Sequence, residues 1–117
     1  MKLDGIWEPV EVVLVGEEIP ADLTASISFS VTGNHFVFTI GAEPNKGTLH
    51  YFPYTVPMGI DMMVESGPNK KQTLKGIYKY SGGFLFICLN FFSEERPKKF
   101  ASTKENKFYN IRFKRAE

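Results

Sequence analysis

The sequence predicts an all-β protein: a single antiparallel up-and-down β-barrel of about eight strands. Two observations support this prediction. Apolar and polar residues alternate in most segments, and turn signals recur roughly every 8–12 residues. No segment sustains the 3.6-residue periodicity of a helix. The chain has 117 residues, of which 43% are hydrophobic. That length supports one core but not two, so residues 1–117 are expected to form one domain.

The first predicted strand covers residues 3–15 and holds the single tryptophan, Trp7. We expect Gly5 and Trp7 to plug one end of the barrel. Pro9 cannot donate a ladder hydrogen bond, which indicates an edge or a bulge at this point. A bulge shifts the inward face by one residue. It would let Val10, like Val12 and Leu14 after it, point inward together with Trp7.

The remaining strands follow from alternation and from the turn residues between them. Residues 26–32 give the clearest pattern, because three apolar side chains alternate there with serine and threonine. The segment 17–23, which contains a proline, is expected to be a loop with one helical turn. The expected strands after the first cover residues 26–32, 35–40, 47–52, 60–64, 73–80, 84–91 and 107–115.

The barrel interior is the best candidate for a binding site. A small barrel either holds one small ligand or is filled by its own side chains, and the bulky inward residues leave both alternatives open. Tyrosines are of interest because each buried hydroxyl needs a partner. The residues expected to face a small apolar ligand are Tyr51, Tyr78, Tyr109, Phe29, Phe38 and Met62.

The ordered series of short motifs resembles the lipocalin-like barrels of the calycin superfamily. It is most similar to a family of small uncharacterised bacterial domains that is common in planctomycetes. The motifs include Gly5-Ile6-Trp7, Gly47-Thr48, Gly67-Pro68 and Lys114-Arg115. The resemblance implies that Trp7 closes one barrel end and that Arg115, from the last strand, lies over its ring. It implies no particular activity.

One departure from that family concerns the strand at 84–91. Alternation points Leu85 and Ile87 inward, so Phe84 and Phe86 must point outward, where the family usually has polar residues. Monomers rarely leave such an apolar patch open. Either the segment 97–108 folds across it, or the face serves as a protein-interaction surface, for example in a homodimer.

No catalytic or metal-binding constellation is recognisable. His35 and His50 lack metal-ligand spacing and are expected to be solvated. Cys88 has no neighbouring base, so it is expected to be a small, semi-buried hydrophobe. The sequence therefore predicts a protein that is not an enzyme and that has no cofactor. Two functions remain open: a barrel that binds a small apolar molecule, and an interaction module that uses Phe84 and Phe86.

Charge is distributed unevenly along the chain. Residues 1–65 carry 2 basic and 9 acidic side chains, and residues 66–117 carry 12 basic and 4 acidic ones. Barrel closure should pair the first strand with the last and place Glu8 and Glu11 near Arg112 and Lys114. A basic set in the last loop suggests nucleic acid, but no aromatic platform at strand spacing accompanies it. That set is Arg96, Lys98, Lys99, Lys104 and Lys107.

The sequence contains no feature of a membrane or secreted protein. No apolar run approaches the roughly 20 residues that a transmembrane helix needs. The N-terminus lacks the apolar segment of a signal peptide. We therefore expect a cytoplasmic protein with no membrane partner and no nucleic acid partner.

Overall fold

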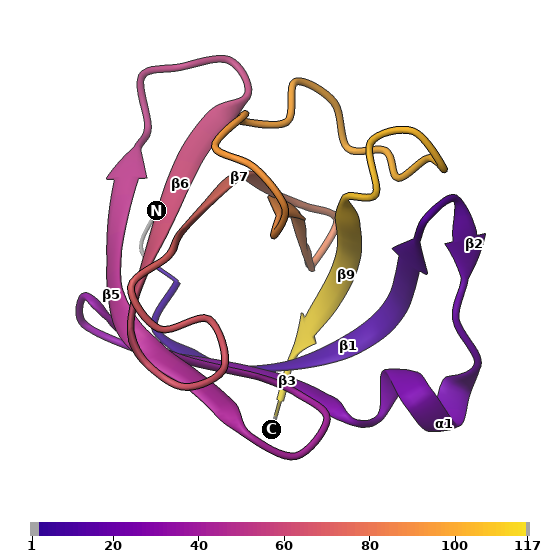
Figure 1. Ribbon diagram of the computed structural model, residues 1–117, viewed down its shortest axis with the longest axis horizontal. Helices are drawn as coiled ribbons and strands as arrows, with labels where there is room; N and C mark the ends of the chain where they lie inside the picture. The colour runs from indigo at the N-terminus through magenta and orange to yellow at the C-terminus, as the bar shows by residue number, and fades with distance from the viewer. Residues whose placement is uncertain (1–2, 117) are drawn as a thin grey trace.

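In the computed structural model, which describes residues 3–116, the chain forms a closed antiparallel β-barrel (Figure 1). The first strand, β1 (Gly5–Leu14), pairs with the last, β9 (Tyr109–Arg115), and this pairing closes the sheet. The predicted all-β barrel is confirmed. The strands between them are β3 (Ile27–Thr32), β4 (His35–Ile40), β5 (Pro44–Phe52), β6 (Met58–Ser66), β7 (Thr73–Ser81) and β8 (Phe84–Asn90).

Two short elements lie outside the ring of eight strands. The two-residue strand β2 (Glu17–Glu18) pairs with the end of β1, and α1 (Ala21–Thr24) follows it (Figure 1). Together they occupy the segment predicted as a loop with one helical turn. Among residues 3–116, α1 is the only helix, and none is long and apolar enough to cross a membrane.

Two strands begin earlier than predicted: β6 begins at Met58 rather than at residue 60, and β5 begins at Pro44 rather than at residue 47. Pro44 and Asn45 lie opposite Thr39 and Phe38 of β4. Buried side-chain hydrogen bonds explain the early start of β5. The Asn45 amide donates to Asn69 Oδ1 at 2.9 Å, and its Oδ1 accepts the Asn69 backbone N–H at 2.8 Å. These bonds hold the turn after β6 against the start of β5.

The predicted bulge in β1 is confirmed, but one side chain was misplaced. The register with β9 shifts between Pro9 and Glu11, and Val12 beyond the shift is fully buried. Val10 is 38% exposed and does not join the core, which corrects the prediction for this residue. The reason is that Val10 is the extra residue of the bulge, and such a residue is left out of the ladder.

The inward side chains form one continuous core that fills the barrel. The sequence-predicted residues Phe29, Phe38 and Met62 belong to it and are at most 1% exposed. Phe29 packs against both Phe38 and Phe113, with ring centroids 5.6 Å apart in each pair. Aromatic contacts across the barrel therefore join β3, β4 and β9.

Trp7 closes one end of the barrel, where β1 meets β9. Its ring is 1% exposed, and its Nε1 donates to the Leu3 carbonyl at 2.9 Å. The Arg115 guanidinium carbon lies 4.3 Å from the Trp7 ring centroid, and Nη1 donates to the Asp4 carbonyl at 2.6 Å. Gly5 has φ +131°, and a Cβ there would collide with the Arg115 side chain. Glycine is therefore required beside this contact.

Replacing Arg115 with alanine should destabilise this end of the barrel. A cation–π contact contributes about 0.5–2 kcal/mol, so we expect a loss of free energy of unfolding within that range and a lower melting temperature. Trp7 fluorescence should shift to the red as water reaches the ring. Lys114→Ala, one residue earlier in β9, is the control. If Lys114→Ala produced the same fluorescence shift, the assignment of Arg115 would be wrong.

Candidate functional site

The tyrosines predicted to line the interior are not equivalent. Tyr78 is 1% exposed and packs edge-on against Tyr51, with ring centroids 5.8 Å apart. Tyr51 is half-buried at the Trp7 end of the barrel, where its hydroxyl accepts the Leu3 backbone N–H at 3.4 Å. Tyr109 is half-buried beside Phe91, opposite the end of β1. Burial raises the pKa of all three phenols.

The interior has little room for a ligand in this conformation. Tyr78 is almost completely buried against its neighbours, and so are Phe29, Phe38 and Met62. The Tyr78 hydroxyl is buried and has no hydrogen-bond partner among residues 3–116. A molecule entering here would gain that hydroxyl as a partner but would have to displace packed side chains, which is unfavourable in a dense core.

A second apolar layer lies on the outside of the barrel. Ile77 and Cys88 pair across β7 and β8 and point outward, yet they are only 1% and 0% exposed. The long segment 91–108 connects β8 to β9 (Figure 1). It covers both side chains, because Ala101 contacts Cys88, and Arg96 and Pro97 line the same surface as Ile77. The Cys88 thiol donates to the Ala101 carbonyl at 3.7 Å, and Asn110 Nδ2 donates to the Phe100 carbonyl at 3.1 Å. Burial raises the pKa of Cys88 to about 11, which favours the protonated thiol over the reactive thiolate at neutral pH.

The outer phenylalanines were predicted to be covered, and two cations of the neighbouring strands partly cover them. Phe84 and Phe86 are half-buried. The Arg112 guanidinium lies over Phe84 at 5.1 Å, and the Lys79 ammonium lies over Phe86 at 4.9 Å. The homodimer stays a prediction, because the cover leaves part of both rings exposed.

Arg96 fixes the covering segment to the barrel wall. Its Nη1 donates to the carbonyls of Ile60 at 3.0 Å and Gly76 at 2.9 Å. Its Nη2 contacts Asp61 Oδ1 at 2.6 Å, and Lys75 contacts Oδ2 of the same carboxylate at 2.9 Å. Asp61 is only 9% exposed, so its charge is balanced by two cations rather than by water.

Sequence reasoning missed this cluster because it grouped Arg96 with the loop lysines. Those lysines are exposed, whereas Arg96 is partly buried. A signal was present in Asp61, an acid at an outward position of a strand that is otherwise mostly apolar. A buried acid needs a cation, but the sequence could not say which of the basic residues would reach it.

An apolar groove lies between this anchored segment and the β5–β6 loop. It has a volume of about 480 Å³, and the Arg96 guanidinium lies 4.9 Å from the Phe52 ring at its wall. Val56 at the rim of the groove is 99% exposed, and Tyr54, two residues earlier, is 97% exposed. We call this space the apolar groove. Its lining residues are Phe52, Thr55, Val56, Pro57, Ile77, Arg96, Pro97 and Lys98.

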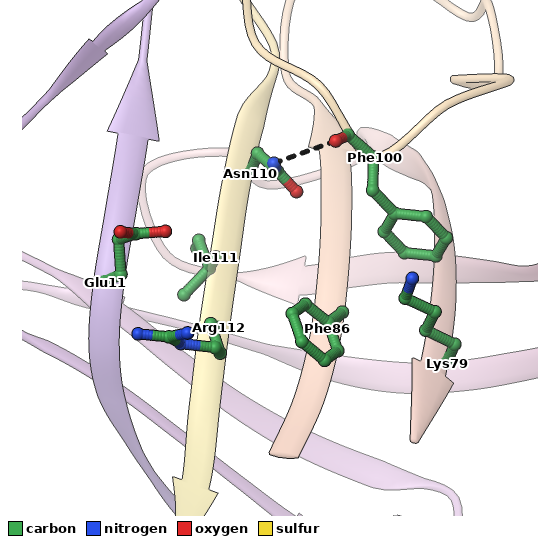
Figure 2. A pocket seen from close by; sticks show the side chains of 7 residues that line it. All are labelled: Glu11, Lys79, Phe86, Phe100, Asn110, Ile111 and Arg112. Atoms are coloured by element: carbon green, nitrogen blue, oxygen red, sulfur yellow. Dashed lines mark hydrogen bonds between the residues drawn. The ribbon is translucent and has the colours of Figure 1, made fainter. Parts of the chain in front are cut away.

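A smaller, charged pocket lies farther along the same outer surface (Figure 2). Its volume is about 180 Å³, and side chains from β1, β7, β8 and β9 meet there under the Phe100 ring. We call it the cationic pocket. Its lining residues are Glu11, Lys79, Phe86, Phe100, Asn110, Ile111 and Arg112.

Neither histidine lines the apolar groove or the cationic pocket. His35 and His50 are exposed, and His50 stacks beside Phe52 at 4.7 Å. Within residues 3–116, no group of three His, Cys, Asp or Glu side chains is placed to hold a metal ion.

The predicted charge pairing across the closing seam is present. Glu8 lies opposite Lys114 and Glu11 opposite Arg112. The Glu8 carboxylate and the Lys114 ammonium are 3.8 Å apart, and both side chains are more than half exposed. An exposed pair of this kind contributes about 0–1 kcal/mol, so the seam depends mainly on backbone pairing and on the core.

No family model, curated protein or solved structure matches this chain. Kinship with the lipocalin-like families therefore stays a prediction.

Proposed function

We propose that this protein is a binding module without catalytic activity, and that it takes a small apolar molecule bearing an anionic group in the apolar groove. The observation that carries the proposal is the composition of that groove. Its walls are apolar except for Thr55 and the two cations Arg96 and Lys98. Small-molecule sites have volumes of roughly 300–1,000 Å³ and combine apolar walls with a few polar groups, as this groove does.

The two cations would act differently on such a ligand. Arg96 is already bound to Asp61 and two carbonyls, so it forms a fixed wall rather than a free partner. Lys98 is exposed and forms no ion pair within the described chain. Lys98 is therefore the group available to attract an anion, while Val56 and Phe52 supply apolar contact.

The sequence patterns predicted an apolar ligand inside the barrel, and the buried Tyr78 hydroxyl is the one observation that favours that location. The groove is preferred because it is open without displacing any core side chain.

The test uses the dye 1-anilinonaphthalene-8-sulfonate, which is apolar and anionic. We expect the wild type to enhance its fluorescence without a change in elution volume. Val56→Asp removes an apolar contact and adds a repelling charge, so it should weaken dye binding at least tenfold. Lys98→Gln should weaken it by a smaller factor.

The matched control is Leu23→Asp, because Leu23 is 55% exposed on α1 and does not line the groove. If this variant weakened dye binding as much as Val56→Asp, the groove would not be the site. If only Tyr78→Phe weakened it, the ligand would instead enter the barrel interior.

A further inference from the structure

The cationic pocket is built on one row of outward side chains that crosses four neighbouring strands. Glu11 of β1 lies opposite Arg112 of β9, Arg112 lies opposite Phe86 of β8, and Phe86 lies opposite Lys79 of β7. Adjacent strands are about 4.8 Å apart, so the backbones carrying Arg112 and Lys79 are about 10 Å apart. The Phe86 ring forms the floor between the two cations (Figure 2).

Neither cation is neutralised within the described chain. The Lys79 ammonium lies between two rings, 4.9 Å from the centroid of Phe86 and 4.8 Å from that of Phe100. It forms no ion pair with an acidic side chain of residues 3–116. The two rings hold its charge at the pocket wall.

Arg112 shows an unsatisfied hydrogen-bond donor. Its Nε is buried and makes no hydrogen bond to any of the residues that the structure describes. The guanidinium stacks on Phe84, and no ion pair within 4 Å links it to Glu11, although the two residues are opposite in register. A buried N–H without a partner is costly, so an acceptor placed beside it would be bound favourably.

We propose that the cationic pocket is a second binding site, distinct from the apolar groove, and that it binds the carboxylate of a small organic acid. The planar carboxylate pairs with Arg112, whose guanidinium matches it in shape. The apolar part of the ligand lies over Phe86, and Lys79 lies at the end of the ligand that is farther from Arg112. A volume of about 180 Å³ suits a molecule of the size of benzoate.

Glu11 and Arg112 should have opposite effects on the binding of a carboxylate. Glu11 is the one acid among the lining residues, and it faces the same space as the ligand carboxylate. Removing its charge should therefore tighten binding, whereas removing Arg112 should weaken it. A nonspecific cationic surface would not show this pair of opposite effects at neighbouring positions.

The experiment titrates the full chain with sodium benzoate and follows the side-chain N–H signals of Arg112 and Asn110 by NMR. We expect saturable shifts in the wild type and a loss of at least tenfold in affinity for Arg112→Gln. Arg112→Lys should recover only part of it, because the planar fork is absent. Glu11→Gln should tighten binding about fivefold, the factor for one unit charge at close range in water.

Lys114→Gln is the control, since Lys114 is the next residue of β9, carries the same charge and does not line the pocket. Its effect should be less than twofold. A parallel titration uses N-acetyl-aspartate α-amide, in which the side-chain carboxylate is the only free acid. Comparing it with benzoate distinguishes the source of the carboxylate. Tighter binding of benzoate indicates a free acid, and tighter binding of the aspartate amide indicates the side chain of a partner protein.

Three results would overturn the proposal. The first is the absence of any shift with either probe in the folded wild type. The second is equal weakening by Lys114→Gln and Arg112→Gln. The third is binding that occurs only in Glu11→Gln, because Glu11 would then itself be the carboxylate that occupies the pocket. Glu11→Gln keeps the test decisive even if Arg112→Gln fails to fold.

Discussion

Replacing Arg96 with methionine is expected to lower the free energy of unfolding by about 2–3 kcal/mol. The substitution removes three hydrogen bonds from the guanidinium and leaves the nearly buried Asp61 with one cation, Lys75. Methionine preserves most of the apolar stem, so the loss reflects the polar contacts. Urea unfolding measures this loss of free energy. The slope of the free energy of unfolding against urea concentration should be the same in the variant and the wild type.

The same substitution should also uncover Cys88. The covering segment 91–108 would lose its anchor, and a thiol reagent should then modify Cys88 faster than in the wild type. The matched control is Lys98→Met, which changes an exposed charge two residues away and should leave both stability and thiol reactivity nearly unchanged. Equal losses in the two variants would mean that Arg96 does not anchor the segment.

Replacing Gly47 with alanine is expected to cost about 3 kcal/mol. Gly47 follows a register shift between β5 and β6, where the two strands approach closely. A Cβ at this position would collide with the Met63 carbonyl oxygen and would lie 2.9 Å from its carbon. Both atoms belong to the backbone, so the strands would have to separate. Thermal unfolding followed by circular dichroism provides the measurement.

Gly33→Ala is the control for that experiment. Gly33 lies in the β3–β4 turn with φ +62°, and no atom would lie within 4 Å of an added Cβ. Only the left-handed backbone opposes alanine there, at about 1 kcal/mol. If Gly47→Ala proved no more destabilising than Gly33→Ala, the close approach of β6 would not be the reason for glycine at position 47.

The barrel could be predicted because local pattern and global architecture agree. The alternation of Ile27, Phe29 and Val31 is sufficient to identify β3 and its inward face. The errors occur where a strand departs from period two. Val10 was misplaced because the bulge takes one residue out of the ladder, and a proline alone does not show which one.

The candidate sites were less predictable, because both depend on the path of the segment 91–108. This segment has almost no regular structure, so no periodicity indicates where it lies. The seam prediction placed Glu11 near Arg112. Nothing in the sequence indicates that Phe100 would close the cationic pocket from above, or that Arg96 would reach Asp61.

The pairing of β1 with β9 has a consequence for the synthesis of this protein. Trp7 lies opposite Arg115, so the contacts that close the barrel join positions 108 residues apart in the sequence. Until β9 has left the ribosome, β1 and β8 are open edges that can pair with other chains. The nascent chain should therefore be prone to aggregation until β9 has been synthesised, and folding should be slow for a domain of this size. A destabilised β9 would expose the same edges in the finished protein.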